Sequence, residues 1–252
     1  MKDGSARGGE AGAVTGRGDA GVAPRSGNGE IEAFLDSVAR TVPAAGAGRL
    51  IFALDATMSR QPTWDLATEL QAEMFDEALK AGGLAVSLVY FRGLGECRAS
   101  RWVSDSAALK SMMARIDCRA GHTQIGRVLT HAVETARENR VAALVYVGDA
   151  MEENPDDLAA AAGELALLGV RTFLFQEGHD PVAERTFREI ARVTGGAHVR
   201  FEPGAARRLG ELLRAVAAYA AGGLKALTAL SGRGGEGARL LIAAMPGGGG
   251  AR

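Results

Sequence analysis

Apolar runs alternate with longer amphipathic stretches between residues 49 and 222, and this alternation restricts the fold more than any other feature of the chain. Such an order of strand and helix patterns is typical of a doubly wound (Rossmann-like) α/β sheet with helices on both faces. We predict a six-stranded, mostly parallel sheet, with strands at 50–54, 84–91, 97–103, 141–147, 170–175 and 198–201, and helices at 62–81, 105–116, 124–139, 154–169, 181–194 and 205–221.

The ends of the chain differ in composition from this central region. Residues 1–30 contain nine glycines and almost no large apolar side chains, so they cannot bury enough surface to offset the entropy of ordering. We expect a disordered tail there, followed by a short amphipathic helix and linker at 31–48 and by the main domain at 49–222. The C-terminal extension, 223–252, is predicted to hold a flexible glycine-rich break at 231–237, a short helix or strand at 238–245, and a disordered end.

Composition and charge exclude some classes of function. The chain has 252 residues, of which 47% are hydrophobic and 23% charged, which is enough for one domain with a sizeable core. A net charge of −1 predicts no nonspecific attraction to nucleic acid or to an anionic membrane. Cys97 and Cys118 are too few for a disulfide scaffold. Since the sequence also shows no apolar run long enough for a signal or transmembrane segment, we expect a cytoplasmic protein.

Three oxygen-bearing side chains directly follow the first predicted strand. Asp55, Thr57 and Ser59 alternate in the segment D-A-T-M-S, and this spacing can aim all three side chains at one point. Carboxylate and hydroxyl oxygens are ligands of hard cations such as Mg²⁺, Mn²⁺ or Ca²⁺. Thr123, before a predicted helix, and Asp149, after a later strand, supply matching oxygens. Because ligands of open α/β sheets lie outside the carboxyl ends of strands, we predict that these five residues share one metal site.

Each of these residues also has an interpretation that needs no ligand. Asp55, Ser59 and Thr123 are of the types that cap helices, and Asp149 alone is a plausible turn residue. Their joint placement after two predicted central strands and before one helix favours the metal site.

Other side chains near this edge receive structural interpretations. We interpret the acids that follow Asp149 as a solvated loop and the start of a helix, where negative charge is favourable. Trp64 and Trp102 are candidates for exposed aromatic anchors, although core packing is favoured for at least one of them. His122 is interpreted as a surface loop residue. The acids are Glu152, Glu153 and Asp156.

The five oxygen-bearing residues resemble the metal-ion-dependent adhesion site (MIDAS) of von Willebrand factor A (VWA) domains. That site reads D-x-S-x-S, then a distant Thr, then an Asp after a later strand. The resemblance covers roughly residues 49–222. It implies that three residues are hydroxyl ligands and that two acids bind directly or through water. The hydroxyl ligands are Thr57, Ser59 and Thr123, and the acids are Asp55 and Asp149.

Two positions depart from the pattern of the family. Thr57 stands where the family usually has Ser, and Gly148-Asp149-Ala150 replaces the common Thr-Asp-Gly. Both changes keep the oxygen count. The resemblance also implies that the strand at 97–103 is an antiparallel edge strand.

The resemblance implies a function as well as a fold. In VWA domains, a carboxylate of a partner protein fills an open position on the metal. The chain looks like an intracellular bacterial member of the family, and some of these act as adaptors beside AAA-type ATPases. We therefore expect a divalent-metal-dependent protein-binding module. Its partner would be a protein that supplies an Asp or Glu ligand, for example in an AAA-type ATPase complex, and not a nucleic acid or a membrane.

An enzyme is the competing class, for example a Mg²⁺-dependent phosphatase or hydrolase. A strand that ends in Asp, with a second acid after a later strand, also suits phosphoryl transfer. A haloacid-dehalogenase-type hydrolase, however, would need a second Asp where this chain has Thr57, and a Lys that the core hardly supplies. The sequence shows no Ser-His-Asp elbow, glycine-rich phosphate loop or Cys nucleophile motif. We therefore expect no catalytic function, and a Rossmann-like nucleotide binder is the third alternative.

Overall fold

Successive side chains of the first strand point to opposite faces of the sheet and are buried on both, which explains why this strand is hydrophobic along its whole length. The computed structural model describes residue 1 and residues 47–247. In β1 (Gly48–Asp55), the side chains of Leu50, Phe52 and Leu54 enter one hydrophobic core, and those of Ile51 and Ala53 enter a second. A strand with helices on both faces must be apolar on both faces.

Six strands form one sheet in the order β3-β2-β1-β4-β5-β6. All neighbouring pairs are parallel except β2 and β3, so β3 is an antiparallel edge strand. The predicted fold class is therefore confirmed. The other strands are β2 (Leu84–Arg92), β3 (Glu96–Ala99), β4 (Ala143–Gly148), β5 (Arg171–Glu177) and β6 (Ala197–Phe201).

The edge strand is shorter than the predicted segment 97–103. It ends at Ala99, and Val103 forms only an isolated bridge with Val86. The cause is Ser100, whose hydroxyl accepts a hydrogen bond from the backbone N–H of Leu88 at 2.9 Å. At this point a side chain replaces the backbone carbonyl that a regular ladder would use.

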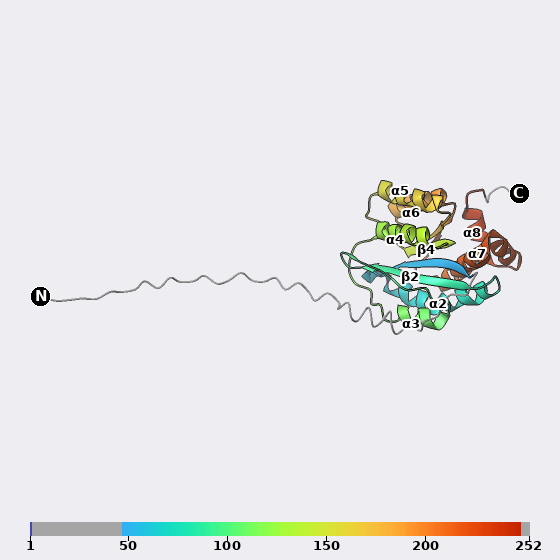
Figure 1. Cartoon of the computed structure of the whole chain (residues 1–252), viewed down its shortest axis with the longest axis horizontal. Helices are drawn as coiled ribbons and strands as arrows, with labels where there is room; N and C mark the ends of the chain where they lie inside the picture. Colours follow the sequence, from blue (N-terminus) through green and yellow to red (C-terminus); the bar gives the residue numbers. More distant parts are fainter. Residues whose placement is uncertain (2–46, 248–252) are drawn as a thin grey trace.

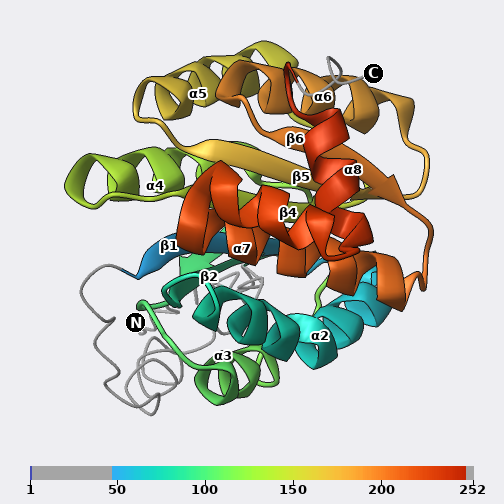
Figure 2. The same cartoon turned by 90° about the vertical axis from the view of Figure 1, so that its right-hand side faces the viewer.

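Helices cover both faces of the sheet, as Figures 1 and 2 show. One face carries α2 (Gln61–Leu79), α3 (Ser106–Met113), α7 (Ala206–Gly232) and α8 (Glu236–Ala244), which contribute to the same hydrophobic core. The opposite face carries α4 (Ile125–Glu138), α5 (Pro155–Leu167) and α6 (Pro181–Thr194), which contribute to the second core. A short 3-10 helix, η1 (Met58–Arg60), joins β1 to α2.

The chain continues as helix beyond the predicted end of the domain at residue 222. α7 is kinked at Gly222 and Gly223, and Gly223 has φ 65° and ψ −160°, a conformation open almost only to glycine. Beyond the kink, Leu227, Leu230 and Leu241 are buried in the same core as β1. The predicted break at 231–237 contains the end of α7 and the start of α8, and the segment 238–245 is helical rather than extended.

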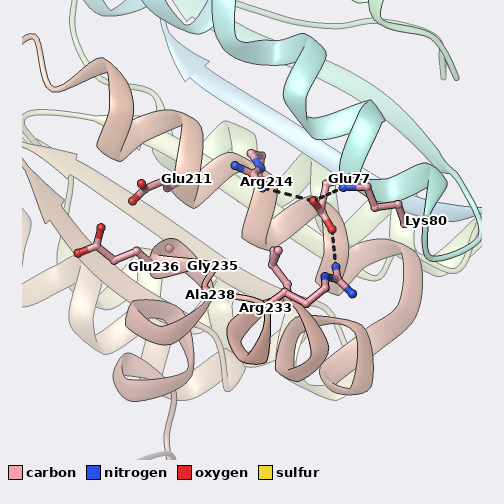
Figure 3. A pocket seen from close by; sticks show the side chains of 11 residues that line it. Glu77, Lys80, Glu211, Arg214, Arg233, Gly235, Glu236 and Ala238 are labelled. Carbon is pink, nitrogen blue, oxygen red and sulfur yellow. Dashed lines mark hydrogen bonds and ion pairs between the residues drawn. The ribbon is translucent and has the colours of Figure 1, made fainter.

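A buried carboxylate ties the end of α7 to α2 (Figure 3). The side chain of Glu77 is 3% exposed and accepts hydrogen bonds from Lys80 at 3.0 Å, Arg233 at 2.9 Å and Arg214 at 3.5 Å. These four residues are called the Glu77 cluster below. Arg214 precedes the kink and Arg233 follows it, so the cluster holds both parts of α7 against the same helix.

The predicted disordered tail, the predicted helix after it, and the chain end after residue 247 lie outside the described residues. Among the helices that the structure describes, none is both long and apolar enough to cross a membrane.

Candidate metal centre

The topology of the sheet brings two strand ends together at one edge. From β1 the chain first adds β2 and β3 on one side, and it then crosses to add β4, β5 and β6 on the other. β1 and β4 are parallel neighbours, with Leu54 opposite Val147, so Asp55 and Asp149 follow directly at the same edge. This is the topological switch point, where open α/β sheets bind their ligands.

Four of the five predicted ligands lie in one continuous set of contacts. The carboxylate of Asp55 accepts a hydrogen bond from the backbone N–H of Thr57 at 2.7 Å. The hydroxyls of Thr57 and Ser59 lie 3.4 Å apart. Ser59 Oγ donates to Asp149 Oδ2, also at 3.4 Å, across 90 positions of sequence. The side chains of Asp55, Thr57, Ser59 and Asp149, called the oxygen cluster below, therefore lie together at this edge.

None of these contacts is a helix cap. Thr57 precedes η1 and makes no side-chain cap hydrogen bond, and α2 begins after Arg60. The carboxylate of Asp55 instead closes a turn to a backbone N–H two residues later. The capping interpretation of Asp55 and Ser59 is therefore wrong for these helices.

Burial makes the charge of Asp55 costly. The residue is 3% exposed. Its pKa is raised to about 6, first by burial and also by the charge of Asp149, while the hydrogen bonds from Thr57 and the charge of Arg60 act in the opposite direction. A cation placed between the two acids would relieve this cost.

Thr123 is engaged by a different acid. Its backbone N–H and its hydroxyl donate to Glu152 Oε2 at 2.9 and 3.1 Å, and the backbone N–H of Glu152 donates back to Thr123 Oγ1 at 3.2 Å. Thr123 does not cap α4, because the cap position is Gln124, which makes no side-chain cap hydrogen bond. The structure thus places Thr123 in the loop that joins α3 to α4, held by the loop that follows β4.

The acids after Asp149 are more structured than we predicted. Glu153 accepts hydrogen bonds from the backbone N–H groups of Ile125 and Gly126, so it caps α4 from another loop. Glu152 is exposed but holds Thr123. The interpretation as a solvated loop is therefore wrong for Glu153, whereas Glu152 is an exposed loop residue as predicted. Asp156 is exposed in the first turn of α5, as predicted.

Arg60 and Glu177 are the residues of this edge that the sequence analysis missed. Arg60 follows Ser59 directly, is 3% exposed, and forms an ion pair with Glu177, the last residue of β5. Its Nη1 also lies 3.7 Å from Asp149 Oδ2. Thr63 donates a second hydrogen bond to Glu177. Glu177 lies two residues after the predicted strand at 170–175. A search for charged residues after every predicted strand, rather than after two of them, could have identified it.

Three buried polar atoms beside the oxygen cluster have no hydrogen-bond partner within the described part of the chain. They are Arg60 Nε, Arg60 Nη2 and Tyr146 Oη. Tyr146 lies on β4 two residues before Gly148, and it interacts electrostatically with Asp55, Arg60 and Asp149. Because buried polar groups are normally paired, these atoms indicate that a further polar group is needed at this place.

The chemistry of the donors fits a hard divalent cation. Carboxylate and hydroxyl oxygens are the preferred ligands of Mg²⁺ and Mn²⁺, and two neighbouring acids, the buried Asp55 and the half-buried Asp149, favour a positive charge. Within residues 47–247, no three His, Cys, Asp or Glu side chains form a group that could hold a metal. Any metal at the oxygen cluster would therefore depend on the hydroxyls of Thr57 and Ser59 as well as on the two acids.

Neither tryptophan is an exposed side chain at this edge. Trp64 is buried, packs edge-on against Tyr90, and donates its indole N–H to the carbonyl of Met113 at 3.1 Å. Trp102 is half-buried beside Arg49, near the start of β1 and hence at the other end of the strand. The suggestion of exposed anchors at the metal edge is therefore wrong for both. His122 is exposed, with Nδ1 3.8 Å from Glu152 Oε2.

Comparisons with known proteins agree with this architecture. The sequence matches no protein-family model and no curated protein. Solved structures do match. A von Willebrand factor type A protein from Catenulispora acidiphila is similar with a TM-score of 0.54 and 18% identity, over 70% of this chain and 43% of that one. The SpRpn10 VWA domain has a TM-score of 0.52 and 12% identity, over 70% and 97%. BatB from Bacteroides thetaiotaomicron has a TM-score of 0.52 and 20% identity, over 65% and 96%.

The fold and the edge described above define a doubly wound α/β domain with an oxygen cluster at its switch point. Its fold is that of the von Willebrand factor A domains, which confirms the family resemblance at the level of the fold. The chain spans less than half of the first of these structures.

Proposed function

We propose that this chain is a divalent-metal-dependent protein-binding module. The contacts that join Thr57 and Ser59 to Asp149 across the switch point are the observation that carries this proposal. They gather hard oxygen donors at the edge where folds of this kind bind ligands. Asp55, Thr57, Ser59 and Asp149 would hold Mg²⁺ or Mn²⁺, and Thr123 would join them after a change in its contact with Glu152.

When bound, the metal would supply an open coordination position with affinity for a carboxylate. The residues of the chain do the rest. The Asp55 carboxylate and the Thr57 backbone fix the turn, Ser59 bridges to Asp149, and the sheet keeps both strand ends in register. We therefore expect a partner protein that presents an Asp or Glu side chain. The VWA domains among the similar structures support a role in protein interaction.

A binding role fits the cysteines better than a catalytic one. Burial raises the pKa of the thiols of Cys97 and Cys118 to about 11. Both are therefore protonated at neutral pH, whereas a nucleophilic cysteine needs a lowered pKa. This supports the binding proposal over an enzyme with a cysteine nucleophile.

Thermal unfolding in chelator and in millimolar Mg²⁺ or Mn²⁺ tests the metal site. A ligand that binds only the folded state at 100 times its Kd adds about 2.7 kcal/mol, which raises Tm by roughly 5–10 °C for a chain of this size. We expect this rise for the natural chain and not for Asp149→Ala. Asp157→Ala, which removes an exposed acid in the first turn of α5, is the matched control and should keep the rise.

The partner side needs a second experiment. An identified partner should bind the natural chain with metal, fail to bind in chelator, and fail to bind Asp149→Ala under either condition. Amidation of the carboxylates of the partner should also abolish binding. Binding that survives chelator would overturn the proposal, as would an equal thermal shift in Asp149→Ala and the natural chain.

A further inference from the structure

Arg60 places a buried positive charge next to the oxygen cluster. Its guanidinium lies in η1, directly after Ser59, and reaches past the end of β4 to Glu177 on β5. On the way, Nη1 comes within 3.7 Å of Asp149 Oδ2. That same oxygen accepts the hydrogen bond of Ser59. The guanidinium of Arg60 therefore contacts Asp149, the acid that Ser59 links to the end of β1.

A divalent ion at this edge would meet Arg60 as a competitor. It would have to share Asp149, which is 30% exposed, with the buried guanidinium of Arg60, and two positive charges this close repel each other. Arg60 cannot easily move into solvent, because its side chain is 3% exposed and Glu177 holds it.

We propose that Arg60 sets the metal concentration at which this site fills, because its guanidinium already engages the Asp149 carboxylate that the cation would need. This inference rests on the proposed metal-binding function and adds a determinant of its affinity. Glu177 also affects the metal affinity in this proposal. It draws the guanidinium toward β5, and so it limits how strongly Arg60 neutralises Asp149.

The alternative is that Arg60 and Glu177 only fasten η1 to the end of β5. The two roles differ in sign. A fastening pair would make the edge less ordered when either residue is changed, so metal affinity would fall or stay unchanged in every variant. A competing guanidinium predicts opposite changes for two variants of the same pair.

The first variant is the double substitution Arg60→Met, Glu177→Gln. It removes the guanidinium without leaving an unpaired buried acid, Met fills much of the same space, and Gln keeps an oxygen for Thr63. The net charge of the pair stays zero. We expect Mn²⁺ and Mg²⁺ to bind about tenfold more tightly or better. The second variant, Glu177→Gln alone, leaves Arg60 with Asp149 as its charged partner, and we expect weaker binding than in the natural chain.

Isothermal titration of the full-length protein with Mn²⁺ and with Mg²⁺ measures these affinities, and the metal ion itself is the only probe needed. Circular dichroism and Tm in chelator report whether each variant is folded. Arg233→Met is the control, because it removes a guanidinium that pairs with a buried acid, Glu77, near the far end of α2. It should leave the metal affinity unchanged. Asp149→Ala added to the double variant should abolish the tighter binding.

The outcomes separate this inference from the proposed function. Tighter binding by the double variant and weaker binding by Glu177→Gln support the inference. Where the natural chain binds too weakly to measure, measurable binding by the double variant still supports the inference, and the weak binding counts against the proposed metal dependence alone. Binding by the natural chain that is not tightened in the folded double variant overturns the inference and leaves the proposed function standing. No binding by either protein overturns both.

Discussion

The carboxylate of Asp55 is buried next to Asp149, and this arrangement destabilises the fold in the absence of a metal. Burial raises its pKa to about 6, so ionisation at neutral pH costs free energy. Asp55→Asn removes the charge and keeps an oxygen that can accept the hydrogen bond of Thr57. In chelator at pH 7 we expect this variant to be more stable by about 1 kcal/mol, a rise in Tm of about 2–4 °C.

The same variant should lose the thermal response to Mg²⁺, because the site has lost one of its two acids. Differential scanning calorimetry of the variant and the natural chain, in chelator and in Mg²⁺, measures both effects. Asp157→Asn, at an exposed position, is the control for a general charge effect. A lower Tm for Asp55→Asn in chelator would show that Arg60 already compensates the charge.

Gly148 departs from the family pattern for a steric reason. A Cβ atom at this position would lie 2.4 Å from Tyr146 Oη and 2.7 Å from its Cζ. Tyr146 is fully buried between Phe91 and Phe187, so it cannot move away easily. We expect Gly148→Ala to destabilise the fold by about 1–3 kcal/mol, as overpacking of a dense core does.

Chemical denaturation measures this change, with Gly163→Ala as the matched control. Gly163 lies inside α5, and a Cβ there would meet nothing within 4 Å. Alanine is the better helix former, so the control should be more stable by about 0.5–1 kcal/mol. Tyr146→Phe removes the nearest atom and should recover part of the loss in the double variant. Equal effects at the two glycines would refute the steric explanation.

At the scale of elements, the Glu77 cluster fastens the C-terminal helices to α2. Burial by itself would raise the pKa of Glu77, but the hydrogen bond and charge of Lys80 and the charge of Arg214 outweigh it and hold the pKa below its usual value. Such a carboxylate stabilises the fold above its unfolded pKa, and this contribution is lost as the pH falls through the lowered value. Glu77→Gln should therefore cost about 1–3 kcal/mol at pH 7.

The loss of stability in Glu77→Gln should affect the C-terminal helices before it affects the whole domain. Hydrogen exchange of the variant should speed up in the segment 224–244 more than in α5, because Arg233 lies beyond the kink in α7. Glu189→Gln is the control, since Glu189 forms an exposed pair with Arg192 within α6 and such pairs contribute little. Uniform exchange rates across the variant would show that the cluster does not act on these helices in particular.

Local patterns predicted the elements, but not the contacts between distant ones. The apolar run of β1 and the Asn154-Pro155 and Asp180-Pro181 starts of α5 and α6 are visible in sequence, because strand burial and helix capping depend on neighbouring residues. The end of β3 was missed, since it depends on a hydroxyl that pairs with another strand.

The contacts of the candidate site also include some that the local sequence predicted and others that it did not. The convergence of Asp55, Thr57, Ser59 and Asp149 was predictable, because parallel strands end at the same edge of a sheet. The ion pair between Arg60 and Glu177 joins residues 117 positions apart and was not predictable, because nothing in either local sequence identifies the other. The contact of Thr123 with Glu152 joins two loops and was not predictable for the same reason.

At the scale of the whole molecule, the stability of the fold in acid depends in part on a histidine on the face of the sheet opposite the Glu77 cluster. His198, on β6, is half-buried against Phe187, and its Nε2 lies 3.0 Å from Gln176 Oε1. Burial first, and then the charge of Arg188, lower its pKa to about 4; Arg200 acts in the same direction and Glu184 in the opposite one.

This lowered pKa makes the folded protein sensitive to mild acid. Between about pH 6.5 and 4 the unfolded chain binds a proton at His198 that the folded chain does not, so stability rises with pH across this window and is lost as the pH falls. Each such group contributes at most about 1.4 kcal/mol per pH unit. The window lies mostly above the one in which Glu77 is protonated, so the two effects can be separated.

Asp55 acts in the opposite direction over much of this window, because its pKa is raised to about 6 and the folded chain binds the extra proton there. We therefore expect Tm of His198→Gln to rise relative to Tm of the natural chain as the pH falls from 6.5 to 4. Gln can keep a hydrogen bond to Gln176 but cannot gain a charge. Burial also lowers the pKa of His131, which adds a dependence of the same sign as that of His198 to both proteins. His179→Gln, at an exposed position, is the control. An unchanged pH dependence in His198→Gln would show that protonation of this histidine does not limit the acid stability of the fold.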